Sequence, residues 1–328
     1  MNFRRFLIKR IAISIILTVV AVSIIFLTMR LLPGDPFGSL VASGDLTTEQ
    51  LEAVRAQYGL DQPLWAQYVQ YLSNILTFNF GYSITQGRPV WDILLPQLVA
   101  TLVLLVPALI ATAIVSTILG MYAGWNRDSL FEKSSIVVTT FFRSTPIFIT
   151  GIFFLIIFAY QLSWFPAFGI RSPTANPEGF AELYLSWDFA KHYFLPFATA
   201  VLFYSGDFLL LSRNSIVERK GAAYLKLHAA KGLNEVEQLA RAGRNSMLPV
   251  VTYFALRMGM LFQGVITLEV VFAWPGIGRG LVTAIQQQDY PTVQAAVFIM
   301  ALAVIIMNLL ADVVYARIDP TVSVGDNV

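Results

Sequence analysis

The sequence predicts an all-α polytopic membrane protein with six transmembrane helices and a small external helical lobe. Of its 328 residues, 56% are hydrophobic and only 13% are charged, whereas about a quarter of the residues of a water-soluble domain are charged. An α-helix needs roughly 20 apolar residues to cross a ~30 Å hydrocarbon core. Six predominantly apolar runs approach or exceed this length, and the basic residues are distributed unevenly between the segments that connect them.

The first run follows a basic N-terminal stretch, which is also typical of a signal peptide. That run is too long for the hydrophobic part of a signal peptide, and no small-residue cleavage site follows Met29. An uncleaved first helix is therefore favoured. The six expected spans are Ile11–Met29, Gln97–Ala123, Ile136–Tyr160, Leu195–Leu211, Val250–Phe272 and Ala295–Tyr315.

The Lys and Arg residues predict the orientation, because the loops that stay in the cytoplasm are enriched in them. With the N-terminus inside, the cytoplasmic segments hold 13 Lys and Arg residues, the external segments hold 6, and the other 3 lie in or at the ends of spans. We therefore expect a multi-pass protein of the inner membrane with both termini in the cytoplasm.

The expected organisation has four parts. Residues 1–32 form the N-terminal segment and first span, residues 33–95 the external lobe, residues 96–316 the transmembrane core, and residues 317–328 a cytoplasmic tail. In the lobe, Thr47 and Gln50 have the spacing of a capping box, and Pro63 suits the first turn of a second helix. For the lobe's aromatic side chains, packing on the membrane surface is favoured over contact with a solute.

The cytoplasmic loop 213–249, which lies within the core, has the pattern of two short helices. A helix over about Gly221–Ala230 is expected to end at Gly232, since glycine accepts the positive φ common at helix ends. Asn234 and Glu237 have the spacing of a cap for the second helix. Between the helices, an elbow (residues 229–233) presents small side chains that suit a groove on a partner protein. The alternative is a solvated basic connector.

The last external segment contains Trp274-Pro275-Gly276-Ile277-Gly278-Arg279-Gly280. Its Gly-x-Gly-x-Gly pattern is found in dinucleotide-binding loops, but no strand precedes it and the predicted topology places it outside. The run containing Trp274, Pro275, Gly276 and Gly278 is therefore interpreted as a tight turn at the external mouth between two spans.

Several chemical classes are excluded by composition. The chain has no Cys and two His, which argues against a disulfide framework, a thiol nucleophile and a metal site. No Gly is followed by Lys anywhere, so the phosphate loop of ATP-hydrolysing proteins is absent from the sequence. The net charge of +2 gives no indication of nucleic-acid binding.

One segment of the loop resembles a known family. Ala229-Ala230-Lys231-Gly232-Leu233, followed by Arg244-Asn245-Ser246-Met247-Leu248-Pro249, is similar to the "EAA" coupling loop of ATP-binding cassette (ABC) importer permeases of the dipeptide/oligopeptide branch, specifically the first-permease (B-type) subunit. Four further segments resemble the family in the same order: Leu31–Pro36, Gly59–Leu64, Phe272–Arg279 and Asp289–Gln294. Together these matches extend over nearly the whole chain.

The resemblance implies a type I ABC importer permease fold and a non-catalytic subunit forming half of a pore. The solute would be an oligopeptide or a related small molecule such as an oligosaccharide. Expected partners are a second homologous permease, two ATPase subunits that carry ATP and Mg²⁺, an extracytoplasmic solute-binding protein and membrane lipid. The implied ATPase-coupling residues are Tyr224, Ala229, Ala230, Lys231, Gly232 and Leu233. Ala222 and Ala223 depart from the family, which has acidic residues before this Tyr.

Two residues of the third span are expected at a gate or along the pore. Pro146 removes a backbone hydrogen bond and predicts a kink, and Arg143 beside it requires a partner or water. An ion-coupled secondary transporter is the alternative function, with Asp207, Glu269 and Asp312 as its candidate ion ligands. Structural pairing of these carboxylates is favoured. An intramembrane enzyme is disfavoured because neither His has plausible co-ligands.

Overall fold

The computed structural model describes residues 3–31, 61–175, 177–260, 262 and 264–318. These residues fold into helices joined by loops, with one isolated antiparallel bridge between Tyr82 and Pro89. The expected first helix of the external lobe, which begins near Thr47, lies outside the described residues. The helices are α1 Phe3–Leu31, α4 Leu64–Leu76, α5 Val90–Trp125, α6 Leu130–Ser144, α7 Ile147–Phe154 with a π-helical extension Leu155–Gln161, α8 Phe180–Tyr184, α9 Trp187–Lys220, α10 Ala223–Ala230, α11 Glu235–Ser246, α12 Leu248–Gly259, α13 Val265–Val271, α14 Ile277–Gln286 and α15 Tyr290–Ile318.

Long apolar helices confirm the predicted fold class. Within the described ranges, four helices are long and apolar enough to cross a membrane: Arg5–Thr28 of α1, α5, α9, and Tyr290–Val314 of α15. A fifth span is formed if the bent pair Leu130–Ser144 and Ile147–Gln161 is counted as one. The protein is therefore an all-α polytopic membrane protein.

Two of the six expected spans are not continuous helices. The third turns by 107° between α6 and α7, because Thr145 is extended and Pro146 sits at the N-cap of α7 instead of inside a kinked helix. The prediction of one helix over Val250–Phe272 is wrong. Its residues form α12 of 12 residues and α13 of 7, separated at Gly264, whose φ of 80° is left-handed.

Several boundaries also differ from the expected ones. Helix α9 continues to Lys220, so the loop between helices starts at Gly221 and not at Arg213. Helix α5 begins at Val90, before the end of the expected external lobe. Residues 273–292 contain α14, where only a short turn was predicted.

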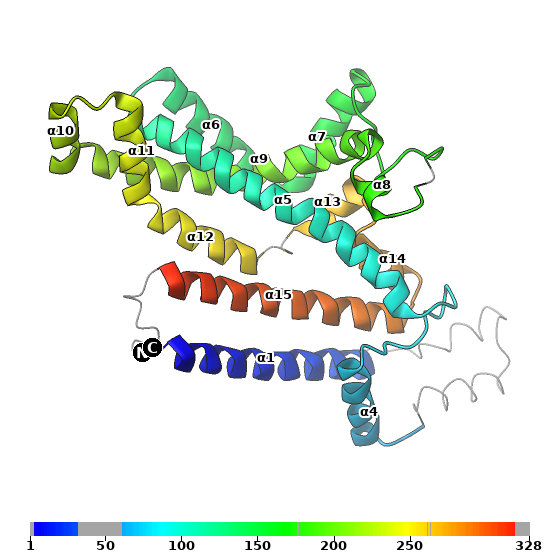
Figure 1. The fold of residues 1–328 in the computed structure, drawn as a ribbon. Helices are drawn as coiled ribbons and strands as arrows, with labels where there is room; N and C mark the ends of the chain where they lie inside the picture. The colour runs from blue at the N-terminus through cyan, green and yellow to red at the C-terminus, as the bar shows by residue number, and fades with distance from the viewer. Residues whose placement is uncertain (1–2, 32–60, 176, 261, 263, 319–328) are drawn as a thin grey trace.

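Helices α5 and α9 pack side by side at the centre of the molecule (Figure 1). Two glycines of α5 make this close approach possible. A Cβ on Gly120 would lie 2.4 Å from the Leu209 carbonyl oxygen, and one on Gly124 would lie 2.5 Å from that of Arg213. Small residues four apart are typical of tightly packed membrane helices, because they let two backbones approach.

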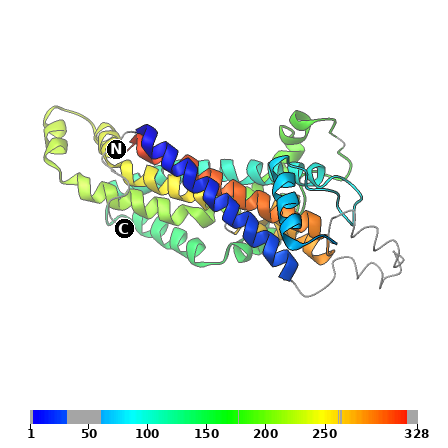
Figure 2. The same ribbon diagram turned by 90° about the horizontal axis from the view of Figure 1, so that it is seen from below.

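Helices α1 and α15 lie side by side on one flank, and the start of α1 and the end of α15 are at the same end of the molecule as α10 (Figures 1 and 2). Arg10 and Asp312 join the two helices in an ion pair of 2.8 Å. At the opposite end, α4 packs on α1: the Tyr68 hydroxyl lies 2.7 Å from the Ser23 hydroxyl, and the Phe26 and Tyr71 rings stack.

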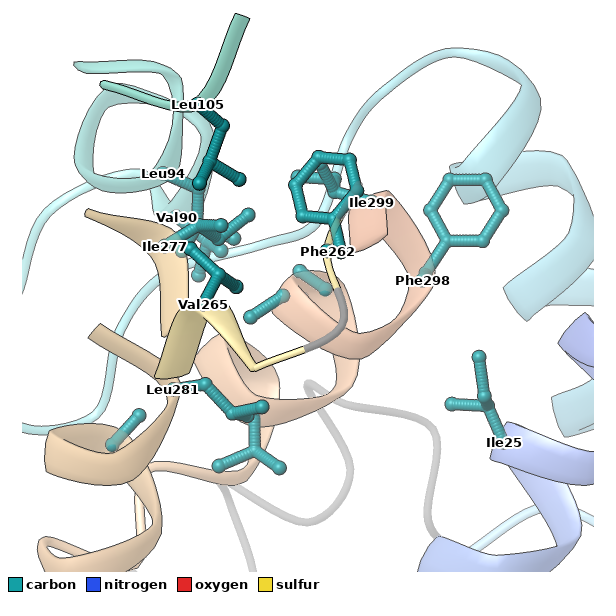
Figure 3. Packing of buried hydrophobic residues seen from close by; sticks show 14 of the residues in the cluster. Ile25, Val90, Leu94, Leu105, Phe262, Val265, Ile277, Leu281, Phe298 and Ile299 are labelled. Carbon is teal, nitrogen blue, oxygen red and sulfur yellow. The ribbon is translucent and has the colours of Figure 1, made fainter. Parts of the chain in front are cut away.

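The largest apolar core fills the space between α5 and the C-terminal helices. Figure 3 shows Leu94 and Leu105 of α5 beside Val265 of α13 and Ile277 of α14, with Ile299 of α15 nearby. Leu94 and Ile277 are fully buried. This core holds the four helices α12, α13, α14 and α15 together as one unit, which packs against α5 and α9.

Candidate functional site

The elbow begins where α10 ends. The Lys231 amide donates to the Leu227 and His228 carbonyls, and the Leu233 amide donates to the His228 carbonyl at 3.2 Å. Gly232 adopts a φ of 82°, as predicted from its position after the helix. This arrangement satisfies carbonyl groups at the helix end that would otherwise lack partners.

A capping box starts the helix that follows the elbow. The Glu237 amide donates to the Asn234 side chain at 2.9 Å, and the Asn234 amide donates to the Glu237 carboxylate at 2.9 Å. Gln238 adds a hydrogen bond from its side chain to the Leu233 carbonyl. The predicted cap is confirmed, and the two helix ends hold the elbow in a defined shape.

One side of α10 attaches the elbow to the bundle. Leu225 is buried in a small cluster with Trp125, Ile216 and Ala242, and Lys220 lies over the Trp125 ring at 5.1 Å. Tyr224 packs against this cluster and contacts the His228 ring edge-on. Tyr224 therefore holds α10 in place and does not share the exposed surface of the elbow.

The other side of α10 is free for contact. Ala229, Ala230, Lys231 and Gly232 are exposed and Leu233 is half-buried, while Leu227 is 54% exposed. Helix α10 also projects beyond the ends of the neighbouring helices (Figure 1). The tip thus presents small and apolar groups together with Lys231, and such a surface can enter a groove on another protein.

The structure places Arg143 at the break between α6 and α7, three residues before Pro146. Its guanidinium lies 3.0 Å from the Asp207 carboxylate of α9. The other oxygen of that carboxylate accepts hydrogen bonds from Arg257, at 2.5 Å, and from Tyr253. Asp207 is thereby paired structurally, as predicted, and so is Asp312 with Arg10.

The Trp274–Gly278 segment is buried except for Pro275, which is half-buried. Trp274 is fully enclosed and donates from its indole nitrogen to the Ala100 carbonyl at 2.9 Å. Pro275 leads to Gly276, which is the N-cap of α14. The segment, expected as a tight turn at the external mouth, connects α13 to α14 and packs inside the protein against α5.

Glu269 explains why glycines occur in this turn. Its carboxylate is fully buried and accepts hydrogen bonds from Thr101 at 2.5 Å and from the Arg279 amide at 2.9 Å. A Cβ on Gly276 would lie 2.0 Å from a carboxylate oxygen of Glu269, and one on Gly278 would lie 2.9 Å from the other. Sequence reasoning missed this link. The acidic residue before an apolar Gly-rich turn was the available signal.

Comparison with known proteins identifies the type of molecule. The family model described as "Binding-protein-dependent transport system inner membrane component" matches residues 116–324, and the model of the N-terminal part of such membrane components matches residues 3–105. The glutathione transport system permease protein GsiC of Shigella flexneri serotype 5b is 34% identical over 319 residues, which cover 97% of this chain and 98% of the relative.

GsiC of Escherichia coli strain K12 has the same identity and coverage, and GsiC of Shigella boydii serotype 4 is 33% identical over 319 residues. The similarity extends through the apolar helices, the elbow and the Trp274 turn. None of these findings supports an ion-coupled secondary transporter. The chain belongs to the family of inner membrane components of binding-protein-dependent transport systems, and it is a permease of the ABC importer type.

Proposed function

We propose that this chain forms half of the translocation pathway for a short peptide or a related small solute, together with a second homologous permease. An extracytoplasmic binding protein delivers the solute, and two ATPase subunits dock in the cytoplasm and carry out ATP hydrolysis with their own ATP and Mg²⁺. The relatives are glutathione transport permeases, which supports a peptide-like solute over an oligosaccharide or a metal complex.

The observation that carries this proposal is the exposed elbow. A groove on the ATPase that receives Ala229 and Ala230 can grip the elbow by its shape, and Lys231 adds a charge beside it. Because Leu225 ties α10 to Trp125 and Ile216, a push on the elbow is transmitted to α5 and α9. Movement of the ATPase is thus coupled to the helices that surround the solute.

Substitution of Ala230 tests the coupling. In a reconstituted importer, Ala230→Asp places a carboxylate at the exposed contact, so uptake of labelled glutathione and transport-coupled ATP hydrolysis should fall together. The permease should remain in the membrane in normal amount. Ala240→Asp, at an exposed position of α11, is the matched control. Normal uptake by Ala230→Asp would contradict the coupling role.

The orientation proposed here, with both termini and the elbow in the cytoplasm, has a direct test. The chain contains no Cys, so single cysteines can be introduced without removing others. Ser73 in α4 and Ala240 in α11 are both exposed and lie at opposite ends of the molecule. An impermeant thiol reagent applied outside the cell should label Ser73→Cys and spare Ala240→Cys; the reverse pattern would overturn the orientation.

A further inference from the structure

Three charged side chains from three helices meet beside the break between α6 and α7. Arg143 comes from α6, Asp207 from α9 and Arg257 from α12. Arg257 is tightly held, since it also donates to the Tyr253 hydroxyl at 2.6 Å and lies over the Tyr204 ring at 5.6 Å. One carboxylate is therefore shared by two guanidinium groups, and the cluster carries an excess positive charge.

Of the two arginines, Arg143 is the one that retains N–H donors for a further hydrogen-bond partner. Its side chain is 52% exposed, against 20% for Arg257. Among the described residues, Arg143 forms an ion pair with Asp207 alone, through a single nitrogen, whereas a guanidinium has five N–H donors. Arg213, by comparison, is paired through two nitrogens with the buried carboxylate of Glu132.

Polar side chains accompany Arg143 at the end of α6, although Val137 and Phe141 of the same helix are exposed apolar residues. Thr140 and Ser144 are also exposed, and their positions three residues before and one after Arg143 put all three near one face at the end of α6. A lipid-facing surface is apolar, and a half-exposed cation in lipid is costly. The end of α6 at Arg143 therefore suits an aqueous or polar neighbour, whereas Val137 and Phe141 suit an apolar one.

Arg143 lies near the far end of α6, beside the break that precedes α7. It is the penultimate residue of the 15-residue α6, which places it about 20 Å along the helix axis from the first residue. Gly206 lets the arginine stem lie close to α9: a Cβ there would be 3.2 Å from two carbons of Arg143. The guanidinium is thus held at a fixed place beside the break that precedes Pro146.

We propose that Arg143 binds the carboxylate of the transported solute beside the α6–α7 break, so that the permease itself selects for peptides with a free C-terminal carboxylate. This inference rests on the proposed function, because it requires that peptides pass this chain. A guanidinium binds a carboxylate with two parallel hydrogen bonds, and Asp207 holds Arg143 while leaving donors for the solute.

The test uses the complete importer in proteoliposomes. Uptake kcat/KM is measured for trialanine and its C-terminal amide, with glutathione as a further solute, in the wild type, Arg143→Gln, Arg143→Lys and the control Lys133→Gln. Lys133 is exposed on the same helix at its other end. The readout is the ratio of free-acid to amide uptake within each variant, so any preference of the binding protein cancels between variants.

We expect the ratio to fall about tenfold in Arg143→Gln, which corresponds to the loss of one charge-assisted hydrogen-bonded contact. It should fall less in Arg143→Lys and stay unchanged in Lys133→Gln. An equal loss for acids and amides, or an unchanged ratio, overturns the inference and leaves the proposed function intact. Loss of the second permease from purified Arg143→Gln would assign Arg143 to that partner instead. A wild-type importer that moves none of these peptides contradicts the proposed function and the inference with it.

Discussion

Glycine residues occur both at the contact between α5 and α9 and at the elbow after α10, and the backbone at the two places differs. Gly120 has helical neighbours on both sides and no room for a Cβ, which would lie 2.4 Å from the Leu209 carbonyl oxygen. Gly232 has a φ of 82° and no atom within 4 Å of an added Cβ. Gly120 is needed because two helices pack closely there. Gly232 is needed because the backbone adopts a positive φ, although its surface is open.

This difference separates stability from coupling. A substitution at Gly120 must move two central helices apart, whereas a substitution at Gly232 changes the shape of a tip that contacts little of its own chain. A bulky substitution at the α5–α9 contact should therefore lower the amount of folded permease. A bulky substitution at the elbow should leave the permease folded but inactive in transport. Three substitutions test this separation, beginning with the largest change in free energy.

Gly120→Val should have the largest effect on folding. The added side chain would overlap the α9 backbone, and overpacking of this kind costs roughly 3 kcal/mol. We expect a strong loss of protein from the membrane fraction and a lower melting temperature in detergent. Gly221→Ala is the control, since a Cβ at Gly221 meets no atom within 4 Å; equal stability of the two variants would show that the α5–α9 contact tolerates bulk.

Gly232→Val should leave folding nearly intact and abolish coupling. A non-glycine residue at a positive φ costs about 1–2 kcal/mol, a cost confined to the elbow because Leu225 and the capping box anchor its flanks. Membrane abundance should stay near that of the wild type, while uptake and transport-coupled ATP hydrolysis fall together. Well-expressed Gly232→Val with normal uptake would mean that the elbow is only a connector.

Asn234→Ala should have the smallest effect. It removes the side-chain acceptor for the Glu237 amide, and loss of such a cap costs about 1 kcal/mol. Amide hydrogen exchange in the first turn of α11 should become faster, with uptake lowered only partly. Asn234→Ser, which retains a capping oxygen, should exchange nearly as slowly as the wild type. Unchanged exchange in Asn234→Ala would indicate that the cap contributes nothing to the elbow.

Local features were predictable from the sequence because their causes lie within a few residues. The membrane class follows from composition, the end of α10 from Gly232, and the start of α11 from the spacing of Asn234 and Glu237. The exposed surface of the elbow followed from its small side chains. Each of these depends on backbone geometry or on hydrogen bonds between near neighbours in the chain.

Features that join distant segments required the tertiary structure. Nothing near Pro146 in the sequence specified whether α6 would kink or turn by 107°, and no local pattern divided Val250–Phe272 into α12 and α13. The shared Asp207, the enclosure of Glu269 by Gly276 and Gly278, and the approach of Gly120 to Leu209 each connect residues on different helices. The sequence by itself determined which segments are apolar helices and where the elbow bends, since these depend on short-range forces. Only the tertiary structure decided which helices break and which charges pair, because those outcomes depend on the space and partners that other helices supply.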